Sequence, residues 1–205
     1  MIQPTAINLR NVAILIFDDI EVLDFAGPFE VFSVAGSLMP QTPYQPFFTY
    51  ALGLTGETIN ARGGLRVNPT FSLDNTPQPD VLIVPGGYGS RRLLKNDRLL
   101  AWLRDTAPKC EIVASVCTGA LVLAAAGLLK DKTVTTHHGA FDRLPELEPS
   151  CNVSRDQRFT VSDDKRIWTS GGISAGIDMS LAIVTHLLGD NAKVVEEMEW
   201  VWHAK

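Results

Sequence analysis

The sequence predicts an α/β fold in which a mostly parallel sheet is covered by helices on both faces. Residues 12–17 form a continuous apolar run, and segments of strand length at 80–84 and 111–116 are mostly apolar after an acidic first residue; such segments are typical of strands buried on both faces. Segments of helical character alternate with these runs, which is the pattern of parallel sheets. Ligands of such sheets bind beyond the carboxyl ends of the strands, so motifs that directly follow a strand are the first candidates for function.

The remaining elements follow one another without a visible domain boundary. Further strands are predicted at 47–54, 133–136, 159–161 and 167–169, the last two forming a hairpin around Asp163 and Asp164. A turn at Gly63 and Gly64 precedes a short edge strand around residues 65–67. Helices are predicted at 23–35, with Pro28 near the start where proline is tolerated, and at 92–106, 120–129, 174–188 and 191–201. Because 205 residues contain no internal repeat or linker, we expect a single domain over residues 1–205.

Composition excludes several classes of function. The net charge is −5 and the densest basic spot is the pair Arg91-Arg92, which argues against a nucleic-acid partner. Three cysteines, an odd and sparse set, do not predict a disulfide framework, and Cys110 and Cys151 are interpreted as structural. The polar start of the chain lacks the apolar core of a signal peptide, and no run is long enough to span a membrane. We therefore expect a cytoplasmic protein.

The strongest local signal is the segment ASVCTGA at residues 114–120. A buried strand runs directly into Cys117, and Gly119 and Ala120 are small enough for the sharp turn into a helix, which is the pattern of a nucleophile elbow. The start of the following helix predicts a lowered thiol pKa at Cys117. A plain buried cysteine is the commoner fate of this residue type, but the strand–Cys–Thr–Gly–helix context favours a nucleophile.

Asp24 lies beyond the first predicted strand, in the segment LDFAGP. A carboxylate at this position either points into the crevice, where it can transfer protons to and from a thiol, or caps the following helix. Position alone leaves both interpretations open.

Three weaker signals also follow strands. Gly86 and Gly87 leave backbone N–H groups exposed, and the Gly87 and Thr118 amides together form a candidate anion-binding pair. His137 and His138 are candidate bases or ligand contacts, with a structural role equally open. The segment GGISAG at 171–176 lacks the lysine of a phosphate-binding loop and is interpreted as a helix start that walls the pocket, with Asp178 contacting the elbow region. No cluster has the spacing of metal ligands, so no metal is expected.

Taken together, these motifs resemble the ThiJ/PfpI family of the class I glutamine amidotransferase-like superfamily. The resemblance covers nearly the whole chain in the same order. It rests on LDFAGPFEVF (23–32), VPGG (84–87), SVCTGALVLAAAGLL (115–129), TTHH (135–138) and GGISAGIDMSLAIV (171–184). It implies a flavodoxin-like sandwich, a homodimer and no cofactor. Exposed apolar residues near the end of the chain, Trp200, Val201 and Trp202, either serve such an interface or cap the core.

Within the family, the motifs are most similar to those of members that hydrate isonitriles to N-substituted formamides. This resemblance implies that Cys117 is the nucleophile, that Asp24 is the general acid and base, and that Thr118 follows the nucleophile in the family pattern. The substrate pocket is then expected to contain Gly86, Tyr88, His137, His138 and Ile173 around a small-molecule substrate. His138 stands where the family pattern has tryptophan, which puts the substrate's identity in question.

Two alternatives remain open. One is glyoxalase-like or deglycase-like chemistry on small carbonyl compounds, which Thr118 disfavours because those members have histidine or alanine after the cysteine. The other is a non-enzymatic redox-sensing or ligand-sensing domain, since exposed cysteines of low pKa oxidise readily. The sequence ends at Lys205, so no helix-turn-helix region is expected of the kind that follows this domain in AraC-type regulators.

Overall fold

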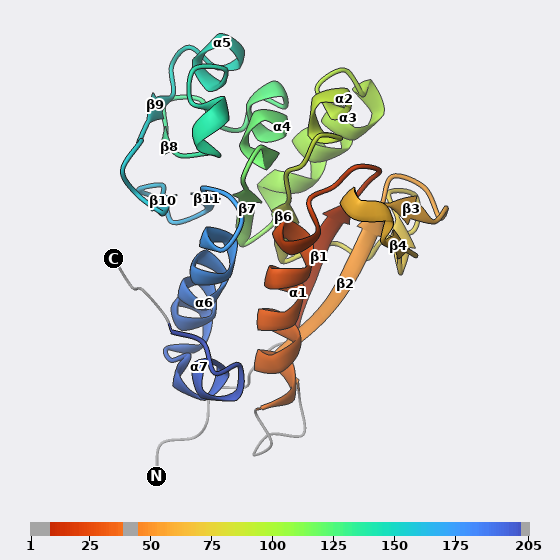
Figure 1. Ribbon diagram of the computed structural model, residues 1–205, viewed down its shortest axis with the longest axis vertical. Helices are drawn as coiled ribbons and strands as arrows, with labels where there is room; N and C mark the ends of the chain where they lie inside the picture. Colours follow the sequence, from red (N-terminus) through yellow and green to blue (C-terminus); the bar gives the residue numbers. More distant parts are fainter. Residues whose placement is uncertain (1–8, 39–44, 202–205) are drawn as a thin grey trace.

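The computed structural model describes residues 9–38 and 45–201. Within these residues a seven-stranded sheet forms the centre of the molecule, and every neighbouring pair of strands is parallel except β10 with β11 (Figure 1). The strand order is β10 (Phe159–Val161), β11 (Ile167–Ser170), β7 (Ile112–Val116), β6 (Val81–Val84), β1 (Arg10–Ile16), β2 (Phe47–Gly53) and β5 (Phe71–Ser72).

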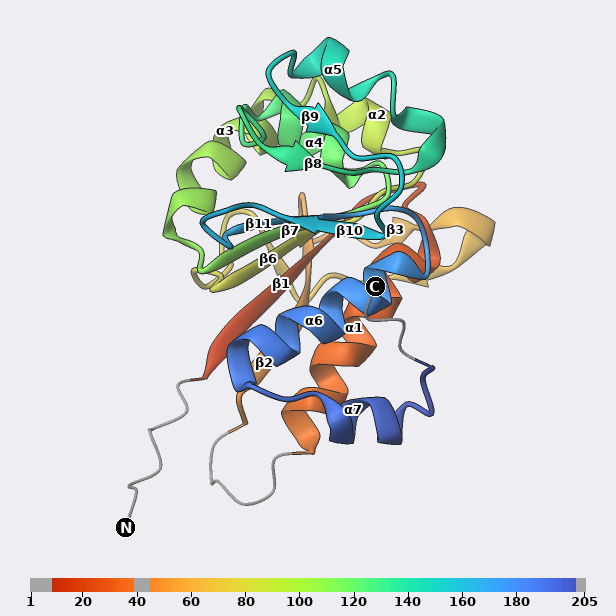
Figure 2. The same ribbon diagram turned by 90° about the vertical axis from the view of Figure 1, so that its left-hand side faces the viewer.

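Helices cover both faces of this sheet (Figure 2). On one face lie α1 (Val22–Ser37), α6 (Ala175–Leu188) and α7 (Ala192–Glu197); on the other lie α2 (Ser90–Leu93), α3 (Asp97–Thr106), α4 (Gly119–Ala125) and α5 (Leu144–Leu147). The central strands β6 and β7 are buried along their length and mostly apolar, because helices cover both of their faces. The predicted α/β fold class is confirmed.

In the described part of the chain, two small sheets and three short 3₁₀ turns lie outside the main sheet. The predicted edge strand around residues 65–67 is β4 (Arg66–Val67), which pairs antiparallel with β3 (Ile59–Asn60) instead of extending the main sheet. The predicted strand at 133–136 is shorter, β8 (Thr133–Val134), and pairs with β9 (Asn152–Val153). The turns are η1 (Arg62–Gly64), η2 (Ala107–Lys109) and η3 (His138–Ala140).

Three helix predictions were wrong in their extent. The helix expected at 92–106 is two helices, because the side chain of Asn96 accepts a hydrogen bond from the Leu99 amide at 3.0 Å and so starts α3 afresh. The helix expected at 120–129 ends at Ala125, shortly before Gly127 adopts a positive φ of 76°. The helix expected at 191–201 ends at Glu197, before Glu199 at φ 47°. Trp202 lies outside the described residues.

The order of the strands determines where a ligand can bind. The chain moves from β1 to β2 on one side and later returns to place β6 on the other side of β1. A crevice forms at such a reversal, outside the carboxyl ends of the strands. The segments that follow β1, β6 and β7 meet there, and they carry Asp24, Gly86 and Cys117 respectively. Among the described helices, none is both long and apolar enough to cross a membrane.

Candidate active site

Cys117 occupies the turn between β7 and α4 in a strained backbone conformation. Its φ is 56°, a region that residues with a side chain seldom adopt. Its amide donates to the carbonyls of Ser170 and Gly171 at 3.0 and 3.2 Å, and its own carbonyl accepts from the Thr136 hydroxyl at 2.7 Å. The turn is therefore held on both sides by neighbouring segments, and the sulfur is directed to the carboxyl edge of the sheet.

Glycines around the elbow permit this close packing. A Cβ on Gly119 would lie 1.9 Å from the carbonyl oxygen of Val84, and one on Gly86 would lie 2.5 Å from the Thr118 nitrogen. On the opposite side, a Cβ on Gly172 would lie 3.1 Å from the Cys117 sulfur and 2.8 Å from the His137 ring. The predicted role of the 171–176 segment as a pocket wall is thus consistent with its place against the sulfur.

Asp24 lies in the first turn of α1 and is completely buried. Glu21 occupies the N-cap position of that helix, so Asp24 is not the helix cap. One carboxyl oxygen, Oδ2, accepts from the Gly86 amide at 3.2 Å, and the thiol of Cys117 faces the carboxyl group. The other oxygen, Oδ1, has no conventional hydrogen-bond partner among the described residues. A buried carboxyl that is only partly hydrogen-bonded is costly to ionise.

When Asp24 is ionised, the thiol of Cys117 keeps its proton, because the pKa of the thiol is higher than the pKa of the carboxyl group. Burial raises the pKa of Asp24 from 3.8 to about 7, with the Cys117 thiol and the Gly86 amide opposing the rise. Burial and the Asp24 charge raise the pKa of Cys117 to about 12, against the lowering effect of the Thr118 amide and hydroxyl. The prediction of a lowered thiol pKa was therefore wrong for the resting protein, because desolvation and a neighbouring carboxylate outweigh the start of a seven-residue helix.

The raised pKa of Asp24 predicts a characteristic pH dependence of stability. The folded state binds the Asp24 proton more tightly than the unfolded state does, so the free energy of unfolding falls as pH rises from about 4 to about 7. A rise from 3.8 to about 7 corresponds to at most about 4 kcal/mol. The free energy of unfolding of Asp24→Asn minus that of wild type is therefore expected to increase by up to about 4 kcal/mol from pH 4 to pH 8. Urea unfolding at both pH values measures this difference. A stability difference that is the same at both pH values would contradict this cause.

Thr118 connects the elbow to the loop after β6. Its hydroxyl accepts from the Gly87 amide at 3.0 Å and lies 2.9 Å from the Ser90 hydroxyl. The Gly87 amide is thus already hydrogen-bonded, so the predicted anion-binding pair of the Gly87 and Thr118 amides is not formed in this structure. The Thr118 amide instead faces the Cys117 sulfur, where it favours the charged form of the thiol.

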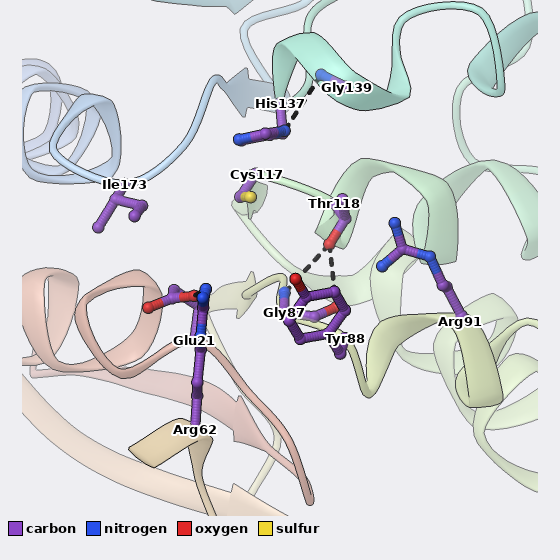
Figure 3. Close-up of a pocket in the computed structure, with 10 residues that line it drawn as sticks. All are labelled: Glu21, Arg62, Gly87, Tyr88, Arg91, Cys117, Thr118, His137, Gly139 and Ile173. Carbon is purple, nitrogen blue, oxygen red and sulfur yellow. Dashed lines mark hydrogen bonds and ion pairs between the residues drawn. The ribbon is translucent and has the colours of Figure 1, made fainter.

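A pocket of about 220 Å³ opens above the Cys117 sulfur (Figure 3). Of the residues predicted for it, Tyr88, His137 and Ile173 line it together with Cys117, and so do Gly87 and Thr118 of the predicted anion-binding pair. Gly86 packs against Thr118 and does not line the pocket, and neither does the buried Asp24. Cys117 itself is only 6% exposed and lines this pocket, so a substrate in the pocket can reach the sulfur.

The two histidines have different positions. His137 lines the pocket, and its Nδ1 accepts from the Gly139 amide at 3.1 Å, which leaves Nε2 to carry the proton of the neutral ring. Burial and the charges of His138 and Arg91 lower the pKa of His137, so the ring is neutral at pH 7. His138 is exposed, contacts His137 with ring centroids 4.1 Å apart and the rings tilted by 34°, and does not line the pocket.

Sequence reasoning missed four residues that line the pocket: Glu21, Arg62, Arg91 and Gly139. Arg62 pairs with Glu21 at 2.6 Å, and both Arg62 and Arg91 lie over the ring of Tyr88, at 5.3 and 5.7 Å from its centroid. No local motif marks Arg62, because it reaches the pocket from the turn between β3 and β4. Glu21 was detectable, since it follows the first strand as Asp24 does.

Asp178 does not contact the elbow, contrary to the prediction. Its carboxylate accepts from Arg158 Nε at 2.7 Å and from Trp200 Nε1 at 3.0 Å. Asp178 therefore links α6 to the residue before β10 and to the segment after α7, and Trp200 packs against the core. Among the residues that the structure describes, no group of three or more His, Cys, Asp or Glu side chains is arranged to hold a metal ion.

Comparisons with known proteins show the family to which the chain belongs. The DJ-1/PfpI family model matches residues 10–186. Isonitrile hydratase from Pseudomonas putida is 35% identical over 91% of this chain and 76% of that protein. The HTH-type transcriptional regulator GbdR of Pseudomonas aeruginosa is 29% identical over 92% of this chain, which spans about half (48%) of that regulator. The crystal structure of a ThiJ/PfpI family protein from Pseudomonas syringae has a TM-score of 0.82 and 25% identity, covering 96% of this chain and 77% of that one. The chain belongs to the DJ-1/PfpI family.

Proposed function

We propose that this protein hydrates an isonitrile to an N-substituted formamide, with Cys117 as nucleophile and Asp24 as general acid and base. The observation that carries the proposal is the pairing of a buried carboxyl of pKa about 7 with the one cysteine that faces the pocket among the described residues. The similarity to isonitrile hydratase supports the choice of substrate.

The first step forms a covalent adduct. Asp24 takes the thiol proton while the Cys117 sulfur attacks the terminal carbon of R–N≡C, and the carboxyl then returns this proton to the same carbon. The product is a thioimidate, R–N=CH–S–Cys117, and Asp24 is again a carboxylate. The Thr118 amide, which faces the sulfur, stabilises negative charge on the sulfur during the transfer.

The second step releases the product. Asp24 accepts a proton from a water molecule while the oxygen of that water adds to the thioimidate carbon. The C–S bond then breaks, and its electron pair passes to sulfur. One water proton ends on nitrogen and the other on sulfur, so R–N≡C and water give R–NH–CHO and the free thiol. Asp24 ends the cycle ionised, ready for the next proton transfer.

A pH profile with Asp24→Asn tests this assignment. Since the carboxylate must accept the thiol proton, kcat/KM for a small alkyl isonitrile is expected to rise with pH and level off above about pH 7 in wild type. Asp24→Asn is expected to lower kcat/KM by about 10²–10⁴-fold, the usual range for general acid–base catalysis, and to lose the inflection near pH 7. Formamide production measured by chromatography gives the rate.

Methylglyoxal serves as the competing substrate in the same assay. Turnover of methylglyoxal to lactate without formamide production from any isonitrile would replace the hydratase proposal with carbonyl chemistry. Redox sensing by Cys117 is disfavoured because redox-sensor cysteines are exposed and of low pKa, whereas this thiol is buried with a raised pKa.

Two expectations from the sequence remain predictions. The homodimer implied by the family resemblance is tested by size-exclusion chromatography with light scattering, in which a mass near 22.4 kDa would contradict it. The cytoplasmic location is tested by cell fractionation.

A further inference from the structure

A second cavity adjoins the pocket at Cys117. Its volume is about 520 Å³, and we call it the distal cavity. Arg91 and Gly139 line both the distal cavity and the pocket, so these residues lie at the border between the two spaces. The distal cavity lies over α4 and is flanked by α2 and α5, which Figures 1 and 2 show on the same face of the sheet.

The lining of the distal cavity combines apolar and cationic side chains. Leu94, Leu121 and Leu147 provide the apolar part, and Leu121 belongs to the buried core beneath. Arg91, Lys95 and Arg143 provide three positive charges, and none of the described residues that line the cavity is acidic. In a chain of net charge −5, this local excess of cations attracts an anion.

Two of these cations lack a carboxylate partner. Within residues 9–38 and 45–201, neither Arg91 nor Lys95 forms an ion pair, while Arg143 pairs with Glu146 in the next turn of chain. The Arg91 guanidinium lies over the Tyr88 ring, at the boundary between the two spaces. A ligand anion can therefore pair with Arg91 and Lys95, whose charges are not neutralised by a carboxylate of the described residues. The apolar surface beside them can accept a hydrocarbon chain.

We propose that the substrate of this protein is an isonitrile whose R group is a short aliphatic chain ending in a carboxylate. The isonitrile carbon lies at Cys117, the chain passes Arg91, and the carboxylate is held by the cations of the distal cavity. This inference rests on the proposed function, because it names the substrate class of the same site.

Calorimetric titration with unreactive straight-chain carboxylates tests the subsite without requiring turnover. Binding to wild type is expected to strengthen with chain length by up to about fourfold for each methylene that becomes buried. Arg91→Gln is expected to weaken binding of every carboxylate about tenfold. Lys95→Gln and Arg143→Gln are also expected to weaken binding of every carboxylate, because the proposal places the carboxylate among the cations of the distal cavity at any chain length.

The matched control is Arg104→Gln, which removes the same charge from an exposed position on α3 away from both spaces. The corresponding alcohols are expected to bind weakly, and none of the four substitutions is expected to change their affinity. Equal effects of Arg91→Gln and Arg104→Gln, or equal affinity for alcohols and carboxylates, would overturn the subsite.

A kinetic series then separates the two proposals. Hydration of neutral isonitriles with no preference for carboxylate-bearing ones would overturn the inference alone, and Arg91-dependent carboxylate binding without hydration of any isonitrile would overturn the function alone.

Discussion

Replacing Cys117 with alanine is expected to lower kcat/KM for isonitrile hydration by about 10⁴-fold or more. Losses of this size follow when the nucleophile of a covalent mechanism is removed. The sulfur is the group that bonds to the isonitrile carbon, and no other described cysteine lines the pocket. The measurement is the rate of formamide formation, with mass spectrometry of the intact protein to detect the thioimidate adduct in wild type and its absence in the variant.

Cys151→Ala is the matched control for this substitution. Cys151 is also a buried free cysteine, but it belongs to the segment around β9 and does not line the pocket. Its replacement is expected to leave kcat/KM within about twofold of wild type. Formamide production by Cys117→Ala at the wild-type rate would refute the covalent mechanism, whatever the adduct measurement shows.

Replacing Gly119 with alanine is expected to lower the free energy of unfolding by about 4 kcal/mol or more. A Cβ at this position would lie 1.9 Å from the Val84 oxygen and 2.9 Å from the Pro85 oxygen, both backbone atoms that cannot turn aside as a side chain does. The elbow and the end of β6 would have to separate, and total stabilities of domains are only about 5–15 kcal/mol. Urea unfolding followed by circular dichroism measures the change.

Gly56→Ala provides the comparison. No atom lies within 4 Å of a Cβ built on Gly56, and its φ is not positive, so its replacement is expected to change stability by less than about 0.5 kcal/mol. Alanine is generally more favourable than glycine within a helix, and Gly119 is the first residue of α4, so helix propensity alone would favour the substitution. A midpoint for Gly119→Ala equal to that of Gly56→Ala would show that helix propensity outweighs the contact with β6.

Local pattern was sufficient where one stretch of chain decides the outcome. The segments 80–84 and 111–116 contain β6 and β7, and the run 12–17 covers most of β1 (Arg10–Ile16), because a strand buried on both faces is mostly apolar. The elbow at Cys117 was visible because the turn needs small residues directly after the nucleophile. Helix ends were less predictable: Asn96 starts a new helix through its own side chain, although the residues on either side of it favour one continuous helix.

The sequence by itself determined the α/β fold, the family and the cysteine at the end of a central strand, since each of these depends on residue types over a short span. Only the tertiary structure decided the protonation of that cysteine. Its pKa depends on how much water the fold excludes and on Asp24, which is 93 positions away along the chain. The same holds for Arg62, Arg91 and the distal cavity, and for the pairing of Asp178 with Arg158. Contacts between segments distant in the sequence form only when the core packs, so no local sequence pattern predicts them.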